Sequence, residues 1–366
     1  MDNVRIQDDL YTYVNQKKLE ELVIPDDMPS AGGFMELNKD VEKIMMKEFE
    51  DMCASNSYPN EYLRRACVLY KAAMNAEKKE ADGAAPALKT LAMVKGLEDI
   101  NAFNKAFKDL ILAGIPLPLS ISVETDLKDA LHHKVYMSGP SVILPDASYY
   151  KPHMAAQKDM ILGVWTNVAR AILAKTDLSP EEQNKYLEDT LAFDAKLGDL
   201  VKTNEEWSDY IKSYNLMKTS KVSKLTSTID LKQILKDAFG FVPADVVISE
   251  PRYFKAFVEV FNEETFEEYK HWAYVTGLVS ACPLLSEELR DLGSMYMRTI
   301  AGIAENTPIE KFAYQLASNV YSGPVGLYYG EKYFGEEAKK DVTEIVYQII
   351  DTYKTRIKNN DILPSF

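Results

Sequence analysis

The chain has 366 residues, 46% of them hydrophobic, which is enough for one large core or two. Its formal net charge of −14 repels phosphate backbones and anionic lipid, so neither nucleic acid nor a membrane surface is expected as a partner. Three scattered cysteines, Cys53, Cys67 and Cys282, form no disulfide framework and favour a reducing compartment. With no apolar signal segment and no run of about 18 apolar residues, the sequence predicts a cytoplasmic protein.

Residues 7–34 open the chain with a short helical pattern followed by turn-rich chain. Pro25 and Pro29 favour extended backbone, because proline disfavours the helical conformation of the residue before it. Gly32 and Gly33 permit close approach to another surface, and no Lys-Ser/Thr follows them as in a phosphate loop. The apolar residues that could share one face of the short helix are Leu10, Tyr13, Val14 and Leu19.

From Asn38 onward the pattern is helical, with apolar residues three or four positions apart. Gly114 and Pro116 end the first helical region in the usual order of glycine and then proline. The spacing predicts helices within residues 37–52, 62–73 and 103–111, and another that begins at Pro86.

The period then switches to alternation over residues 119–123 and 134–144. A small hairpin or ribbon near 119–144 is expected there, as the only sheet of note. It ends on the segment Leu144-Pro145-Asp146-Ala147-Ser148-Tyr149-Tyr150. The predicted fold class is therefore mainly α, a multi-helical lobe with this one small β element.

Helices resume at Pro152 and continue to the end of the chain. Ser179, Pro180 and Glu182 form a capping-box pattern that predicts a helix start. Further helices are predicted over residues 231–239, 251–261, 266–281, 286–303, 308–334 and 337–358. The last of them carries an apolar stripe of Val342, Ile345, Val346, Ile349, Ile350, Tyr353 and Ile357.

Several short segments, taken in order, resemble the neprilysin family of zinc metalloendopeptidases, which includes the endothelin-converting enzymes and the bacterial oligopeptidases of the O type. Lys18 stands where the family usually has tryptophan. The resemblance spans residues 7–361 and covers only the family's amino-terminal region. The matching segments are Asp9-Leu10-Tyr11, Ile24-Pro25, Gly32-Gly33-Phe34, the Leu144–Tyr150 segment and Ser213-Tyr214-Asn215-Leu216-Met217, the last of which is expected between helices.

The resemblance implies three regions: a strap over residues 1–37 that packs on a catalytic lobe, a helical cap lobe over 38–334, and a long helix over 335–366 that leads toward the catalytic lobe. The catalytic lobe is missing from this sequence, and no tryptophan follows Asp361. A truncated or frameshifted family member, an expression fragment or a stand-alone remnant is therefore implied. Apolar surface near residues 10–22 and along the last helix is expected to be exposed and to invite self-association.

A zinc endopeptidase of this class needs two histidines one helical turn apart, with a glutamate beside the first as general base. None of the four histidines stands four residues from another, so the sequence predicts no catalytic and no metal-ligating residue in this chain. The adjacent pair is expected at the surface beside the ribbon, and the histidine next to Trp272 is expected to be packed. The four are His132, His133, His153 and His271.

One substrate-binding residue is implied by the resemblance. Phe34 occupies the place of a phenylalanine that lines the pocket for the substrate side chain just after the scissile bond; the alternative is a core aromatic after a turn. Ser30 and Asn38 stand where dipeptide-releasing relatives carry arginines that hold a terminal carboxylate. Their identity favours a plainer endopeptidase cleft.

Two functions remain open. The first is the amino-terminal lobe of a zinc metalloendopeptidase, which in the complete enzyme caps the cleft, limits access to short peptides and works with zinc held by the missing lobe. The second is a non-catalytic helical scaffold that binds peptides or proteins. A downstream reading frame encoding HExxH would favour the first. Alone, this chain is expected to hydrolyse nothing.

Overall fold

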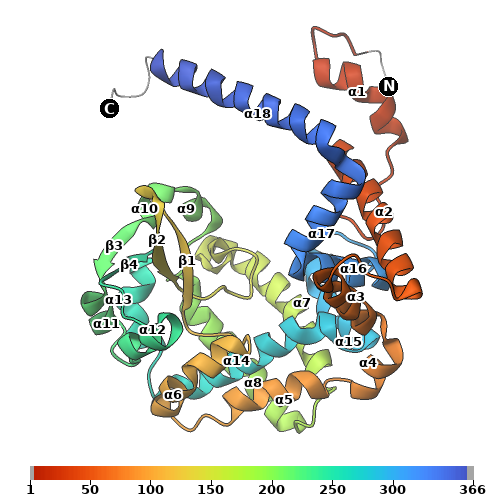
Figure 1. The fold of residues 1–366 in the computed structure, drawn as a ribbon. Coiled ribbons are helices and arrows are strands. Elements are labelled where there is room, and N and C mark those ends of the chain that lie inside the picture. Colours follow the sequence, from red (N-terminus) through yellow and green to blue (C-terminus); the bar gives the residue numbers. More distant parts are fainter. Residues whose placement is uncertain (1–3, 361–366) are drawn as a thin grey trace. The chain divides into compact units, whose positions relative to one another are not determined.

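The computed structural model describes residues 4–360 as a mainly helical chain with one small sheet (Figure 1). The chain divides into two compact units. The central unit is Ala76–Asn306, and the terminal unit combines the segments up to Asn75 and from Thr307. The mainly α fold class with a β-hairpin near residues 119–144 is confirmed.

The terminal unit is built around Phe49, which is fully buried and makes edge-on contacts with Tyr70 and Tyr314 at ring-centroid distances of 5.8 and 5.4 Å. These three rings come from α2 (Gly33–Ser55), α3 (Glu61–Met74) and α16 (Ile309–Val320), so the core joins segments from both ends of the chain. The helices of this unit are α1 (Leu10–Glu21), α2 (Gly33–Ser55), α3 (Glu61–Met74), α16 (Ile309–Val320), α17 (Ser322–Tyr329), the π-helical turn η4 (Gly330–Phe334) and α18 (Gly335–Lys358).

The prediction of one helix over residues 308–334 is wrong, because the chain forms α16, α17 and η4 there. Pro324 lies in the first turn of α17, where its missing N–H cannot continue the hydrogen-bonding of α16. Gly335 then begins α18 with φ +76°, a conformation that glycine adopts without a Cβ penalty. The helical run is therefore interrupted twice before α18, near Pro324 and at Gly335.

The central unit surrounds α14, whose buried residues come from every side of the helix. The predicted capping box at Ser179 and Glu182 is present at the start of α8, and α12 and α14 have the predicted bounds. The helices are α4 (Ala76–Asp82), α5 (Ala85–Lys95), α6 (Ile100–Leu112), α7 (Ala155–Leu173), α8 (Pro180–Gly198), α9 (Asn204–Ser208), α10 (Tyr210–Ser213), α11 (Thr219–Leu225), α12 (Leu231–Phe239), α13 (Pro251–Val260), α14 (Phe266–Ala281) and α15 (Glu287–Ala301), with 3-10 turns η1 (Ala147–Tyr150), η2 (Pro152–Met154) and η3 (Cys282–Leu284).

The sheet of the central unit has four strands: β1 (Ser120–Asp126), β2 (Asp129–Ser138), β3 (Asn215–Lys218) and β4 (Asp245–Ile248). Their order is β1-β2-β4-β3, with β2 and β4 parallel and the other pairs antiparallel. The predicted hairpin belongs to the one sheet of the described residues, but β3 and β4 extend it and were not predicted. The Tyr-Asn-Leu-Met segment lies between helices α10 and α11 as expected, and residues 215–218 of that region form β3. Strands of four residues are too short to display alternation, and their pairing joins distant parts of the chain.

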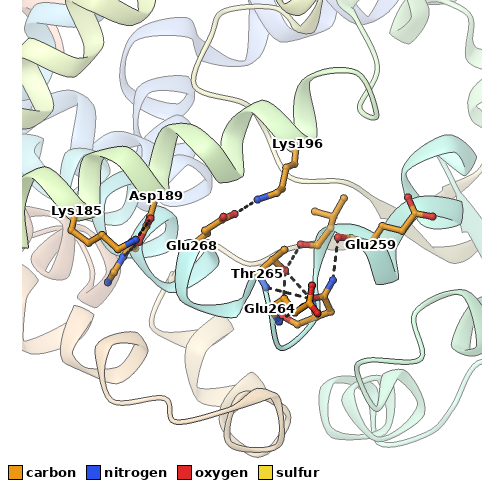
Figure 2. A network of polar contacts seen from close by, with 10 residues as sticks. Lys185, Asp189, Lys196, Glu259, Glu264, Thr265 and Glu268 are labelled. Atoms are coloured by element: carbon orange, nitrogen blue, oxygen red, sulfur yellow. Dashed lines mark hydrogen bonds and ion pairs between the residues drawn. The ribbon is translucent and has the colours of Figure 1, made fainter.

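Polar contacts fix α8 along α14 (Figure 2). Lys196 pairs with Glu268 across the two helices, and Lys185 Nζ lies 2.7 Å from Asp189 Oδ1 within α8. The other Asp189 oxygen lies 2.6 Å from Nδ1 of His271 on α14. These contacts set the register of the two helices that form much of the central core.

Candidate functional site: Phe34, the terminal apolar faces and the loop after β2

Phe34 lies in the first turn of α2 and is 86% exposed. The alternative of a core aromatic is therefore wrong for this chain. The strap before it is held by an ion pair of 2.7 Å between Asp27 and Lys311, both of which are largely buried, and by one of 2.8 Å between Lys18 and Glu36. The exposed ring of Phe34 thus belongs to a helix whose preceding segment is held by ion pairs to α2 and α16.

Two helices of the terminal unit expose apolar faces, which we call the terminal apolar faces. On α1, Leu10, Tyr13, Val14 and Leu19 are all exposed, and no residue of the helix is buried. Leu19 projects to the side opposite Leu10, so the expectation that the four share one face is wrong. No described residue of α18 is buried either. Its stripe residues are between 39% and 65% exposed: Val342, Ile345, Val346, Ile349, Ile350, Tyr353 and Ile357. A contiguous apolar stripe of this length on a helix is typical of an interface.

Glu48 of α2 holds the segment from which α18 starts. Its carboxylate accepts hydrogen bonds from Lys332 Nζ at 2.6 Å and from the hydroxyls of Tyr328 and Tyr333. Burial raises the pKa of Glu48, but these three donors outweigh burial and lower the pKa to about 2. The carboxylate is therefore charged at neutral pH and ties η4 to α2.

Buried acids hold the loop after β2, which carries the Leu-Pro-x-x-x-Tyr-Tyr segment. Glu250 accepts the N–H groups of Gly139 at 2.6 Å and Lys202 at 2.5 Å. A Cβ on Gly139 would lie only 2.9 Å from the Val201 side chain, so glycine is required for this approach. Burial raises the pKa of Glu250, and the two backbone donors oppose this effect.

Asp194 of α8 is the second such acid. It accepts hydrogen bonds from Ile143 N at 3.0 Å, from Trp272 Nε1 at 3.3 Å and from the hydroxyl of Tyr150. Burial raises its pKa to about 6, although each of these donors acts in the opposite direction. The Tyr150 position of the sequence segment therefore serves to close the loop on α8.

Neither Asp194 nor Glu250 follows from the sequence motifs. A signal exists for Asp194, which shares the apolar side of its predicted helix with Leu187 and Leu197 at helical spacing. An acid in such a position needs hydrogen-bond donors from other elements, because burying it unpaired is costly. Glu250 has no comparable signal, since its donors come from two distant loops.

The histidines do not assemble a metal centre. The side chain of His132 is 72% exposed and lies 2.7 Å from Asp129, whereas His271 stacks on Tyr186 at 3.8 Å. Burial lowers the pKa of His271, and the neighbouring Asp189 opposes this. Within residues 4–360, no group of three or more His, Cys, Asp or Glu side chains could hold a metal ion. The described residues therefore do not fit a zinc site.

The cysteines are packed thiols. Cys67 and Cys282 are fully buried, and burial raises the pKa of each to about 12. Cys53 is partly buried, with its Sγ 3.9 Å from the Cys67 carbonyl oxygen. Thiols with such raised pKa values carry little thiolate at neutral pH and are poor nucleophiles.

The described residues therefore form a helical lobe with exposed apolar side chains on α1, α2 and α18. The model of peptidase family M13 matches residues 6–364. The chain therefore belongs to peptidase family M13 and corresponds to the amino-terminal lobe of a neprilysin-like protein.

Individual relatives agree with this assignment. The neutral endopeptidase of Lactobacillus helveticus is 32% identical over 363 residues, which cover 99% of this chain and 56% of the relative. The crystal structure of PepO from Lactobacillus rhamnosis matches with a TM-score of 0.89 at 28% identity, over 99% of this chain and 57% of that one. The chain thus spans about half the length of the relatives it matches.

A third comparison concerns the fold alone. The Mycobacterium tuberculosis zinc metalloprotease Zmp1, solved with an inhibitor, matches with a TM-score of 0.86 at 23% identity, over 100% of this chain and 55% of that one. Separately, none of the helices among residues 4–360 combines the length and apolar character needed to cross a membrane.

Proposed function

We propose that this chain forms the cap lobe of a zinc endopeptidase, covering the substrate cleft and restricting it to short peptides. The observation that carries this proposal is the pair of terminal apolar faces, exposed in a chain that spans about half the length of its relatives. Hydrolysis and zinc binding belong to the HExxH-bearing lobe of the complete enzyme, because this sequence has no HExxH. The chain alone is expected to be inactive.

Each of three regions has a role in this proposal. The amino-terminal region, residues 1–37, provides the strap, and the region of residues 335–366 provides the helix α18 (Gly335–Lys358). Both regions pack on the catalytic lobe of the complete enzyme. Residues 38–334 form the cap over the cleft. Burying an apolar stripe removes its surface from water at about 25 cal/mol per Å², so docking of α18 stabilises the complete enzyme. Without a catalytic lobe, the same faces drive self-association of the chain.

Phe34 is the proposed substrate contact. Its ring is exposed, and the segment before it is held by the ion pair between Asp27 and Lys311. Binding of an apolar substrate side chain to this ring therefore costs little conformational entropy. By the family resemblance, that side chain is the one just after the scissile bond. Ser30 and Asn38 supply no cation for a terminal carboxylate, which favours internal cleavage of the peptide.

A reducing, cytoplasmic location is also proposed. It rests on the three free cysteines, two of which are fully buried thiols. Thiol titration of the purified chain with and without denaturant would detect any oxidised pair.

Docking tests the proposed function directly. The chain is mixed with the HExxH-bearing half of an M13 relative, and complex formation, zinc content and cleavage of a quenched fluorescent peptide are measured. We expect a chelator-sensitive peptidase only in the mixture. Ile349→Glu is expected to weaken the complex at least tenfold, because it places a charge in the stripe. Gln348→Glu adds a charge on the opposite side of α18 and serves as the matched control.

Cleavage by the same mixture tests Phe34. Phe34→Ala is expected to lower kcat/KM about 10- to 100-fold for peptides with an apolar residue after the scissile bond. Leu37→Ala, exposed on the same helix, is the control and is expected to have little effect. Zinc and cleavage in the chain alone would contradict the cap-lobe proposal, and peptide binding without docking would favour the scaffold alternative.

A further inference from the structure

The strand β1 lies at the edge of the sheet (Figure 1). It pairs with β2 from Ser120↔Ser138 through Thr125↔His133. In the part of the chain that the structure describes, the backbone of residues 120–124 makes hydrogen bonds only to β2. The other edge of β1 therefore presents unpaired N–H and C=O groups, which are a template for another strand.

A cavity of about 500 Å³ adjoins the start of β1. Its walls combine aliphatic side chains with two indole rings and a few hydroxyl groups. Residues of this cavity include Leu119, Ile121, Ile111, Trp165, Trp272 and Thr276. An apolar hollow with a few polar groups is the usual form of a pocket that accepts an apolar side chain.

A second cavity, of about 150 Å³, adjoins the middle of the same strand, between α6 and α12. Ile111 and Ile121 line both cavities, so the two hollows are neighbours along β1. Leu119, Ile121 and Val123 are alternate residues and project to one face of the strand. The aliphatic strand residues of both cavities are therefore on that face, and Ser120 and Ser122 complete the walls of the first and second cavity. Residues of the second cavity include Phe107, Ile111, Ile121, Val123, Ile234 and Phe239.

We propose that the open edge of β1 binds an extended peptide by strand addition, with apolar side chains at two alternate positions placed in the two cavities. The backbone groups of β1 hold the peptide main chain, and the cavities select the side chains. Alternate side chains of a strand project to the same side, roughly 6–7 Å apart, which suits neighbouring cavities along one strand. That the ligand is a peptide rests on the proposed function. The new element is a second peptide-binding surface, on the central unit.

The charges around the open edge of β1 restrict the class of peptide that it can bind. Lys108 and Asp237 both line the second cavity and leave it without a dominant charge, whereas Glu124 follows on the open strand. The whole chain carries −14. This field favours neutral or basic peptides over acidic ones.

The test uses the 366-residue chain and two synthetic probes with acetylated and amidated ends. One has the sequence KTLTLTK, and the other, KTTLLTK, has the same composition with adjacent leucines that project to opposite sides of a strand. Titration calorimetry is expected to show affinity for the first that is roughly tenfold or more above that for the second. Equal affinities would overturn the proposal.

The probe backbone supplies an independent test. N-methylation of the amides at alternate positions is expected to abolish binding for one set of amides and to spare the other set, because only one set faces β1. Loss from both sets, or from neither, would contradict strand addition.

Variants locate the site. Ile111→Glu alters a 40% exposed residue shared by both cavities and is expected to lower the affinity for KTLTLTK about tenfold or more. Leu112→Glu, at a neighbouring residue that is 75% exposed and lines neither cavity, is the control with affinity within about twofold. Val123→Glu, at the half-exposed wall of the second cavity, is a further variant should Ile111→Glu fail to fold.

Two further outcomes distinguish the proposed peptide site on β1 from self-association of the chain and from the cap-lobe function. A change in sedimentation with unchanged peptide affinity in Ile111→Glu would mean that a second copy occupies the edge, and it would overturn the proposal. The proposed docking uses α18 in the terminal unit, whereas β1 belongs to the central unit. Loss of peptide binding with intact docking therefore refutes only the β1 site, and loss of docking with intact peptide binding refutes only the cap-lobe function.

Discussion

Helices α14 and α18 differ both in how their apolar residues are arranged and in what surrounds them. Seven residues of α14 are buried, on all sides, against α5, α7 and α8. No described residue of α18 is buried, although its apolar residues form a stripe along one face. Periodic apolar residues thus specify a helix, but only a partner turns its apolar face into core. We infer that the stripe of α18 belongs to an interface of the complete protein.

The largest expected effect contrasts aliphatic truncations in these two helices. Leu278→Ala in α14 removes a side chain that is 0% exposed and is expected to lower the free energy of unfolding by about 2–5 kcal/mol. Ile349→Ala in α18, where the residue is 49% exposed, is expected to change it by less than about 0.5 kcal/mol. Guanidinium unfolding followed by circular dichroism measures both. Similar costs would mean that α18 is already packed in the isolated chain.

A smaller effect concerns Asp194, the buried acid that accepts a hydrogen bond from Trp272 of α14. Burial raises its pKa from the usual 3.8 to about 6. Between pH 3.8 and pH 6, the carboxyl is therefore protonated in the folded state and ionised in the unfolded state. The stability that this group contributes is therefore fully present only below the unfolded pKa. It falls by about 2 kcal/mol as pH rises from 4 to 6, and its loss is nearly complete at pH 7.

The measurement compares the chain with Asp194→Asn, which cannot ionise. The free energy of unfolding, followed by tryptophan fluorescence, is determined for both at pH 4 and pH 7. All three tryptophans lie in the central unit, so the signal reports on that unit. We expect the difference between the two proteins to change by about 2 kcal/mol over this interval. A pH-independent difference would contradict the raised pKa of Asp194.

The smallest effect concerns Glu48, the acid that ties η4 to α2 just before α18. Glu48→Gln removes the charge from three hydrogen bonds and is expected to destabilise η4 by about 1–3 kcal/mol at pH 7. Because the pKa of Glu48 is lowered from 4.5 to about 2, this advantage is lost as pH falls through that range.

Hydrogen exchange of residues 330–334 measures this effect, and the variant is expected to exchange about 10- to 100-fold faster at pH 7. Lys339, which is exposed and pairs only with Glu336 of its own helix, supplies the control substitution Lys339→Gln. Equal protection in the Glu48 variant and the original chain would mean that η4 is held by packing alone.

Much of the helical fold could be predicted from local pattern. The bounds of α12 and α14 and the capping box at Ser179 match the sequence expectations, because spacing and caps are local properties. The break at Pro324 also had a local signal, since proline removes a donor. The strands β3 and β4 had none, because their four-residue ladders depend on partners far along the chain.

The candidate site divides in the same way. The sequence by itself determined the amphipathic character of α18, the lack of HExxH and the position of Phe34 within its motif. Only the tertiary structure decided that Phe34 is exposed, that Asp194 and Glu250 gather donors from distant loops, and that β1 keeps an open edge beside two cavities. The physical reason is that periodicity acts over a few residues, whereas burial and the pairing of buried polar groups depend on which distant segments meet.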